Sequence, residues 1–302
     1  MSPFELVRSE AAQSPRERKK RPSIRRLCIL MNVSTSGFYD WKKRPVNDIK
    51  SGVEPEERLV ATIRTIQEQT DWTCGSRRLQ RELRNYGEEV GRRRIRRLLR
   101  EYSLYSFHKK RFKKTTDSKH SLGYSPNLLE QNFSVRAANE VWVSDITYVW
   151  TSEGWSYLAT VIDLCSRRVV GWAYAKHMRS ELVVTALKRA IELRRPPARM
   201  IVHTDRRSQY ASARYRQLLR EHSLRQSMSG TGNCYDNAVA ESFFASLKKE
   251  CVSRRTFTTR TEAFDAIESY IEGFYNPRRL HSGLGYVSPI NYEQEVDLPQ
   301  AA

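Results

Sequence analysis

One aspartate does most to constrain how this chain can fold. Residues 141–150 form an apolar and aromatic run typical of a buried strand, and Asp145 stands in the middle of it. A buried strand disfavours Asp, because the carboxylate loses its hydration there and Asp has a low strand propensity. The position of Asp145 therefore indicates that the fold or the function requires a carboxylate at that point.

Two further carboxylates occupy positions that would allow them to join Asp145. Asp205 ends a short predicted strand at residues 200–204, and Glu241 lies one turn into a helix predicted to begin near Asp236, with 35 residues between Asp205 and Glu241. Taken singly, the three could be an arginine-paired strand residue, a helix cap and an exposed helical residue. If the fold brings them together, they form an oxygen cage suited to Mg²⁺ or Mn²⁺, which phosphodiester chemistry requires.

The net charge of the chain indicates which class of molecule it binds. The 302 residues carry a formal charge of +19, and the sequence pI is near 9.9, which indicates a polyanion such as nucleic acid. A membrane surface is the alternative, but no apolar run approaches the ~18 residues of a spanning helix. Residues 1–20 have no signal-peptide apolar region, so we expect a cytoplasmic protein at the nucleoid. The five scattered cysteines indicate neither a disulfide framework nor a zinc site.

The first half of the chain is predicted to be helical and very basic. We expect a flexible basic leader at 1–22, a helix-turn-helix-like segment at 23–45, a basic three-helix DNA-binding domain at 56–105 and a basic linker at 106–138. Between Ser76 and Lys114, 15 Lys and Arg face 4 Glu, a net charge of +11. Self-repulsion of this size favours an anionic partner over a merely solvated surface.

The second half is predicted to be a mixed α/β domain. Strand-like runs at 141–150, 155–164 and 168–175 favour a three-strand meander, and a helix at 180–193 leads to the strand at 200–204. We expect a catalytic core at 139–252 and a helical C-terminal extension at 253–302. Four tryptophans are expected in the core of the meander: Trp142, Trp150, Trp155 and Trp172.

Three segments carry a resemblance to a known family. WVSDITYV at 142–149, HTDRRSQY at 203–210 and GNCYDNAVAESFFASLKKE at 232–250 resemble the signature blocks of bacterial insertion-sequence transposases of the IS-three type, which share a retroviral-integrase-like core. GSRRL at 75–79, RRIRRLLRE at 93–101 and NPRRLHSGLGYVSP at 276–289 extend the resemblance. It implies the OrfB subunit, with an RNase H-like mixed-sheet catalytic core preceded by small all-α helix-turn-helix-like domains.

The resemblance also implies an activity. Asp145, Asp205 and Glu241 would be the DDE catalytic residues, holding two Mg²⁺ or Mn²⁺ ions per active site. The enzyme would bind insertion-sequence ends, cleave a DNA strand and transfer its 3′-hydroxyl to DNA. The implied partners are double-stranded DNA at the terminal inverted repeats and the target, further copies of the chain on paired ends, and OrfA or an OrfA-OrfB fusion.

The remaining candidates divide into DNA-binding and supporting residues. Lys248, two helical turns after Glu241, matches a DNA-contacting position of the family, although a solvated lysine is the alternative. His203 and Asn237 are supporting candidates that could equally be a packed histidine and a helix cap. The arginines expected to bind DNA are Arg77, Arg78, Arg93, Arg94, Arg96 and Arg97.

Arg207 is a departure from the family, which usually has Gly at that point. A glycine would permit a positive φ or a close substrate approach, whereas an arginine could impair activity or add a phosphate contact. Two rival functions follow: a catalytically inactive, transposase-derived DNA-binding regulator, and an RNase H-like nuclease without strand transfer.

Overall fold

The computed structural model describes residues 6, 23–42, 55–107, 125–129, 137–229 and 238–297. Asn237 and almost all of the predicted leader lie outside these residues, as does most of the linker at 106–138. The chain divides into two compact units, residues 1–61 and 62–302, which are considered separately.

Residues 23–42 of the first unit form two short helices. Helix α2, Ile24–Leu30, begins after Ser23, whose hydroxyl accepts a hydrogen bond from the Arg26 backbone N–H, and α3 covers Thr35–Lys42. Leu27, Cys28 and Phe38 form a small buried cluster. The helical period read from the sequence therefore corresponds to a pair of helices with its own apolar contacts.

Three helices form the basic region. Helix α4 covers Pro55–Gln69, α5 covers Ser76–Asn85 and α6 covers Arg92–Glu101, and the apolar residues at helical spacing, such as Ile63, Leu79 and Ile95, are fully buried. The buried Gln67 amide donates to the carbonyls of Cys74 and Leu104 at 3.0 and 3.1 Å. These bonds tie α4 to the segments before α5 and after α6.

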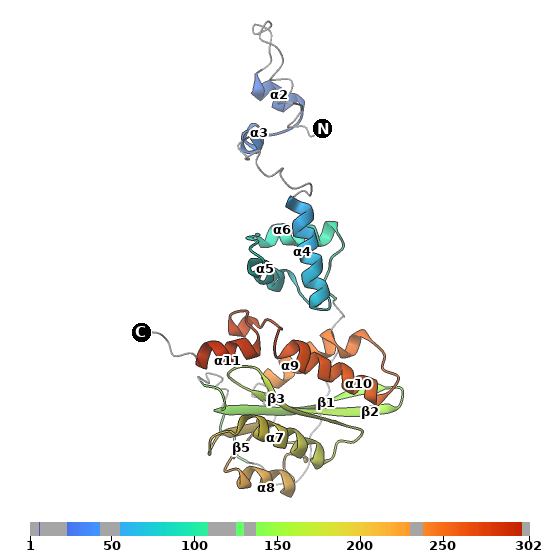
Figure 1. The fold of residues 1–302 in the computed structure, drawn as a ribbon, viewed down its shortest axis with the longest axis vertical. Helices are drawn as coiled ribbons and strands as arrows, with labels where there is room; N and C mark the ends of the chain where they lie inside the picture. The colour runs from blue at the N-terminus through green and yellow to red at the C-terminus, as the bar shows by residue number, and fades with distance from the viewer. Residues whose placement is uncertain are drawn as a thin grey trace, which may run out of the picture. The chain divides into compact units, whose positions relative to one another are not determined.

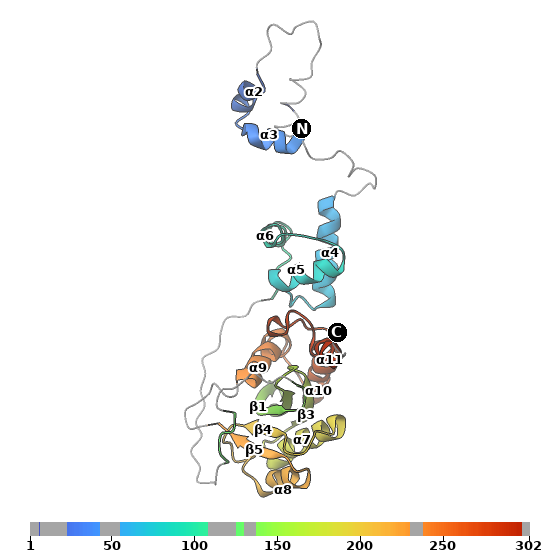
Figure 2. The ribbon, with the colours of Figure 1, turned by 90° about the vertical axis from the view of Figure 1, so that its left-hand side faces the viewer.

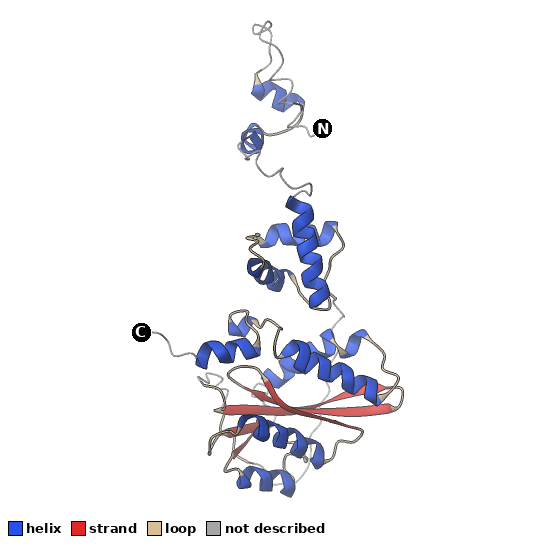
Figure 3. Cartoon of the chain, in the orientation of Figure 1, coloured by secondary structure: helices blue, strands red, loops and turns tan. Residues whose placement is uncertain are grey.

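A five-stranded mixed sheet organises the second half (Figure 3). Strands β1 (Val141–Thr151), β2 (Gly154–Asp163) and β3 (Val169–Ala175) form the predicted antiparallel meander. Strand β4 (Ile201–Thr204) pairs parallel with β1, and β5 (Arg225–Met228) pairs parallel with β4, giving the order β3-β2-β1-β4-β5. This arrangement confirms the predicted RNase H-like fold class, and β5 is a strand that the sequence pattern did not indicate.

Helices cover both faces of the sheet (Figures 1 and 2). Helices α7 (Ser180–Arg194) and α8 (Ala213–Glu221) pack on one face, where they share an apolar core with β1, β2 and β3. A Cβ at Gly171 of β3 would lie 2.4 Å from the Ala186 carbonyl oxygen, so a glycine permits the close approach of α7. None of the helices in the described ranges has both the length and the apolar character needed to span a membrane.

The other face carries the C-terminal helices. Helix α9 (Ala238–Glu250) is followed by a 3₁₀ turn (Val252–Arg254), α10 (Arg260–Glu268), a π-helical segment (Ser269–Tyr275), a second 3₁₀ turn (Ser282–Leu284) and α11 (Pro289–Asp297). Ile267 and Ile271 share one core with Val143 of the sheet and Phe243 of α9. The C-terminal helices are therefore part of the packing that covers the sheet.

Helix α11, which the sequence pattern did not indicate, is held by an ionic cluster. Glu293 accepts hydrogen bonds from the Ser166 hydroxyl and from Arg168, both at 2.7 Å, and is also ion-paired with Arg194. The cluster joins α11 to the β2–β3 turn and to the end of α7.

Two of the four tryptophans expected in the core are not there. Trp142 and Trp172 are buried, but Trp150 and Trp155 are 54% and 49% exposed and pack edge to face across the β1–β2 pair, with ring centroids 4.9 Å apart. The prediction was wrong for these two because strand alternation identifies residues on one face, whereas the extent of the covering helices decides which of them are buried.

Candidate active site

Strand pairing places Asp145 and Asp205 side by side. The parallel ladder between β1 and β4 ends at the pair Ser144 and Thr204, and each aspartate is the next residue along its own chain. Because parallel strands run in the same direction, both carboxylates emerge at the same end of the ladder. Asp145 is 9% exposed, and its Oδ1 accepts a hydrogen bond from the Ile146 backbone N–H at 2.7 Å.

One arginine lies between the two carboxylates. Arg207 Nε is 2.9 Å from Asp205 Oδ2, and Arg207 Nη1 is 3.7 Å from Asp145 Oδ1. Nη1 also donates to the Ile146 carbonyl at 2.8 Å, and the Arg207 backbone N–H donates to Asp205 Oδ1 at 3.0 Å. Both Asp205 oxygens are therefore engaged by this one residue. Arg207 does not have a positive φ, so the backbone there does not require the glycine usual in the family.

The site has an excess of negative charge. Burial, together with the charge of Asp205, raises the pKa of Asp145 to about 7, although Arg207 opposes the shift. Burial works against the charge on Arg207, but the two aspartates outweigh it and raise the Arg207 pKa. The ionised forms of the two carboxylates and one shared guanidinium sum to a formal charge of −1, which a proton on Asp145 or an additional cation neutralises.

Glu241 lies near this pair without forming a closed cage with it. It occupies the first turn of α9 and is exposed, and its negative charge contributes to the raised pKa of Asp145. Across the described residues, no group of three or more His, Cys, Asp or Glu side chains lies close enough to hold a metal ion. The structure thus brings Asp145 and Asp205 together and leaves Glu241 at their side. Asn237 is outside the described residues.

Lys248 lies on the same side of the sheet as Glu241, farther along α9. Its ammonium lies 5.1 Å from the centroid of the Tyr148 ring, in a cation–π contact beside β1. Burial lowers the pKa of Lys248, and the charge of Asp145 opposes this shift. The lysine is therefore close enough to Asp145 to be influenced by its charge.

His203 stabilises the strands that carry Asp205. The buried ring lies 2.8 Å from the Ser227 hydroxyl through Nδ1 and 3.1 Å from the Ser229 hydroxyl through Nε2. Both serines are on β5 or directly after it, so His203 links β4 to β5 next to the site. The Tyr210 hydroxyl lies 3.0 Å from the Ser144 hydroxyl, beside Asp145. Tyr210 ends the HTDRRSQY segment at 203–210, but the sequence did not reveal this contact.

The predicted DNA-binding arginines fall into two environments. Arg77, Arg93 and Arg96 are exposed, as are Arg94 and Arg97, and Arg97 is ion-paired with Glu101 at 2.8 Å. Arg78 is partly buried, and its Nη2 donates to Glu250 at 3.1 Å. The same helices present further exposed arginines that the helical period could have identified: Arg81, Arg84, Arg92 and Arg100.

Glu250, at the end of α9, is the centre of a second ionic cluster that sequence reasoning missed. Its carboxylate accepts hydrogen bonds from Arg279 Nε at 2.7 Å, Arg279 Nη2 at 2.8 Å and the Tyr270 hydroxyl at 2.8 Å, in addition to Arg78. Burial alone would raise the pKa of Glu250, but Arg279 and Arg78 outweigh it and lower the pKa to about 2.

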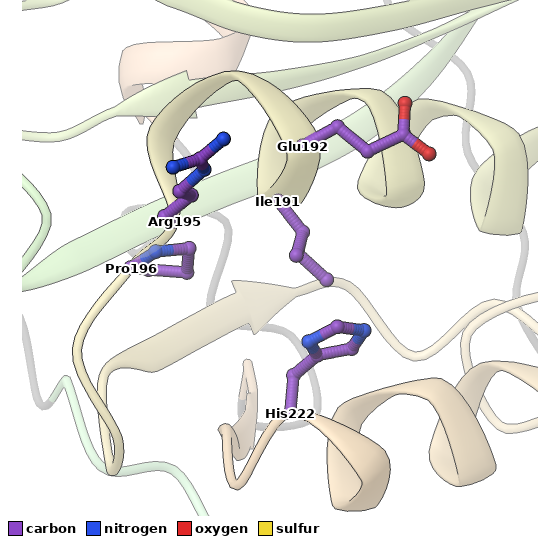
Figure 4. Close-up of a pocket in the computed structure, with 5 residues that line it drawn as sticks. All are labelled: Ile191, Glu192, Arg195, Pro196 and His222. Atoms are coloured by element: carbon purple, nitrogen blue, oxygen red, sulfur yellow. The ribbon is translucent and has the colours of Figure 1, made fainter.

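A surface pocket of about 510 Å³ lies apart from these clusters (Figure 4). It is formed where the end of α7 faces the end of α8, and its lining residues are Ile191, Glu192, Arg195, Pro196 and His222. No predicted site residue lines it, so the pocket is not part of the carboxylate site.

Family comparisons match almost the whole described chain. An integrase core domain family matches residues 135–234, a second integrase core domain family matches residues 241–296, and an HTH-like domain family matches residues 54–112. The integrase core matches contain Asp145, Asp205 and Glu241.

Individual relatives are similar over nearly their full length. The chain is 44% identical over 269 residues to the insertion element IS600 uncharacterized 31 kDa protein of Shigella sonnei, covering 89% of this chain and 98% of the relative. It is 39% identical over 273 residues to transposase InsF for insertion sequence IS3A of Escherichia coli K12, covering 90% and 94%.

Two solved structures are more distant. A chain of the simian T-cell lymphotropic virus intasome in complex with PP2A regulatory subunit B56 gamma aligns with a TM-score of 0.46 and 15% identity, covering 80% of this chain and 77% of that one. The HTLV-2 integrase catalytic core domain in complex with magnesium aligns with a TM-score of 0.41 and 15% identity, covering 52% and 97%.

Proposed function

The chain belongs to the IS3 family of insertion-sequence transposases, and from this membership we propose that it cleaves a DNA strand at the ends of an insertion sequence and joins the freed 3′-hydroxyl to DNA. The observation that carries the proposal is the meeting of Asp145, inside β1, and Asp205, directly after β4, at the end of the parallel ladder between these two strands. Their common cation, Arg207, supports the view that both carboxylates face one cationic position.

The donor set fits a hard divalent cation. Carboxylate oxygens are preferred ligands of Mg²⁺ and Mn²⁺, and this pair has an unbalanced negative charge that a cation would neutralise. We assign Asp145 and Asp205 as ligands and Glu241, whose charge already acts on Asp145, as the third. Two ions held there would supply activation of the attacking oxygen and stabilisation of the leaving 3′ oxygen.

The protein's own residues position the DNA. The exposed arginines of α5 and α6, named above, would neutralise phosphates at the terminal inverted repeats, because they lie on one basic helical region. Lys248, beside Asp145, would contact a phosphate near the cleaved bond. His203 and Asn237 would support the site, and His203 would do so by fixing β4 to β5.

The proposed oligomeric assembly is inferred from the proposed strand-transfer reaction. Two element ends must be joined in one event, so we propose that further copies of the chain assemble on paired ends, with OrfA or an OrfA-OrfB fusion as an additional partner. The domain limits proposed are a helix-turn-helix-like segment at 23–45, a DNA-binding domain at 56–105, a catalytic core at 139–252 and an extension at 253–302.

The deciding experiment supplies labelled element-end DNA with Mg²⁺ and compares the wild type with Glu241→Gln. Nicking followed by joining in the wild type, and neither in the variant, would support the transposase. Hydrolysis without joining would instead identify a nuclease.

One observation favours a second candidate, a catalytically inactive DNA-binding regulator, because Arg207 occupies the position between the aspartates. End binding that persists without any metal-dependent nicking would establish the regulator.

A further inference from the structure

Arg207 holds the two aspartates in the way that a metal ion would. Its Nε meets Asp205 Oδ2 at 2.9 Å and its Nη1 approaches Asp145 Oδ1 at 3.7 Å, so a single guanidinium lies against both carboxylates. The Ile146 carbonyl accepts from the same Nη1 at 2.8 Å and fixes the orientation of the planar group. The side chain is about one-fifth exposed, so it is seated in the site rather than extended into solvent.

A divalent ion and this guanidinium cannot occupy the same position. Asp205 Oδ1 accepts the Arg207 backbone N–H at 3.0 Å, and Oδ2 is bound to Arg207 Nε. For a metal ion to bind Asp145 and Asp205 together from the position between them, the Arg207 side chain must leave that position, since two cations cannot share it and repel each other.

We infer that Arg207 is a resident cation of the active site, and that divalent metal binds only by displacing its guanidinium from Asp145 and Asp205. The inference rests on the proposed metal site and adds to it a competing group within the chain. When displaced, the guanidinium remains next to the site, where a DNA phosphate can take the place of the aspartates as its partner.

Displacement reduces the apparent affinity for metal. Charge-assisted hydrogen bonds of this kind favour the conformation with the guanidinium between the aspartates over the displaced conformation by about tenfold to a hundredfold. Because only the displaced conformation accepts the ion, the apparent dissociation constant for metal is raised by roughly the same factor. Removal of the guanidinium should therefore tighten metal binding by about tenfold or more.

The test measures Mn²⁺ binding to the full-length chain by isothermal titration calorimetry and by electron paramagnetic resonance of free Mn²⁺, without DNA. Arg207→Ala should bind Mn²⁺ at least tenfold more tightly than the wild type. It should also melt at a lower temperature without metal and gain more from added Mn²⁺, because two like charges lose their shared cation. Wild-type or weaker Mn²⁺ affinity in Arg207→Ala would overturn the inference.

The Arg207→Lys variant distinguishes the hydrogen-bonding geometry of the guanidinium from its positive charge. A lysine keeps the positive charge but lacks the fork that meets Asp205 and the Ile146 carbonyl together, so it should bind Mn²⁺ several-fold more tightly than the wild type. If it matches the wild type while Arg207→Ala binds tightly, the positive charge alone is responsible and the specific role of the guanidinium is refuted. Arg206→Gly is the matched control, because Arg206 Nε donates to the Ser229 carbonyl at 2.7 Å, and its Mn²⁺ affinity should stay within about twofold of the wild type.

Displacement can also be observed directly in the wild type. The ¹⁵N-labelled Nε–H resonance of Arg207, assigned by its loss in Arg207→Ala, should move when Mg²⁺ saturates the site, and an unmoved resonance would overturn the inference. Asp145→Asn in the wild-type background tests the metal site by itself. If Asp145→Asn leaves Mn²⁺ binding unchanged, the proposed metal site fails; if it abolishes binding and Arg207→Ala has no effect, only the role of Arg207 fails.

Discussion

Two ionic clusters in the same unit combine acids and arginines in opposite ratios. At the end of the ladder between β1 and β4, Asp145 and Asp205 share the single guanidinium of Arg207. At the end of α9, the single carboxylate of Glu250 is shared by Arg279 and Arg78. The pKa of Asp145 is raised by burial and by its acidic neighbour, whereas the pKa of Glu250 is lowered by its arginines in spite of burial.

The difference separates a functional site from a structural one. The Glu250 carboxylate has its partners within the chain, and they join α5, α9 and the C-terminal region. With both carboxylates ionised, the aspartate pair retains a negative charge that protonation of Asp145 or an additional cation neutralises. A cluster left with unbalanced charge inside a fold is the stronger candidate for ligand binding.

Substitution of either aspartate is expected to have the largest effect of all, and the property affected is catalytic activity. Asp145→Asn or Asp205→Asn removes a metal-ligating charge and should reduce Mg²⁺-dependent nicking of element-end DNA by roughly a thousandfold or more. In Asp145→Asn the new amide oxygen can still accept the Ile146 N–H, and the neutral side chain relieves the repulsion from Asp205, so stability should not fall. Gel-shift binding of the same DNA is the control, and nicking at the wild-type rate would contradict the assignment.

The same kind of substitution at Glu250 should affect stability instead. Glu250→Gln leaves Arg279 buried without a counter-charge, and the free energy of unfolding should fall by about 3 kcal/mol. Urea unfolding followed by circular dichroism measures this loss. Nicking by the folded variant should remain within a few-fold of the wild type. A stable but inactive Glu250→Gln would remove the distinction between the two clusters.

Acid should destabilise the protein through the Glu250 cluster. The folded-state pKa of Glu250 is about 2, below the ordinary 4.5, so its contribution is complete above about pH 4.5 and is lost as the pH falls towards 2. Burial and the charges of Arg279 and Arg78 lower the pKa of His281 to about 3, so its protonation in the unfolded chain also costs stability below about pH 6.5.

Below about pH 4, where Asp145 is protonated in both the folded and the unfolded chain, urea midpoints should therefore decrease as the pH falls. Glu250→Gln should show a shallower decrease below pH 4.5, because that variant has no carboxylate to protonate. An identical pH dependence in both proteins would show that Glu250 does not carry the effect.

The smallest effects should distinguish Arg78 from the arginines exposed on α6. Arg78→Ala removes one of the partners of Glu250 and should reduce stability by about 1–2 kcal/mol. Arg93→Ala should leave stability unchanged, weaken end binding and reduce the log–log salt slope by about 1, since it removes one phosphate contact. Fluorescence anisotropy at several salt concentrations, with unfolding curves for both variants, makes the comparison. Equal stability of the two variants would place Arg78 with the DNA-binding arginines.

Much of the fold could be predicted because its signals are local. Apolar periodicity located β1, β2, β3 and α7 close to their observed limits. Strand β5 was missed because its four residues, Arg225–Met228, are mostly polar and form a strand only by pairing with β4. Helix α11 follows a proline-containing tail and is held by Glu293 through contacts more than 90 residues distant in sequence.

The candidate site was predicted in its residues but not in its contacts. An aspartate inside an apolar strand is a conflict visible in the sequence, and the motif around Asp205 made its partner recognisable. The contact of Arg207 with both aspartates was not visible, because it depends on where the loop after β4 returns towards β1.

The sequence by itself determined the chemical inventory of this protein: the basic helices, the three acidic residues and the strand pattern of a mixed sheet, all of which depend on local propensity and residue type. Only the tertiary structure decided how opposite charges are shared, placing one guanidinium between two aspartates and one carboxylate against two arginines. The physical reason is that an ionic interaction depends on distance and burial, and both are set by packing between segments that lie far apart in the chain.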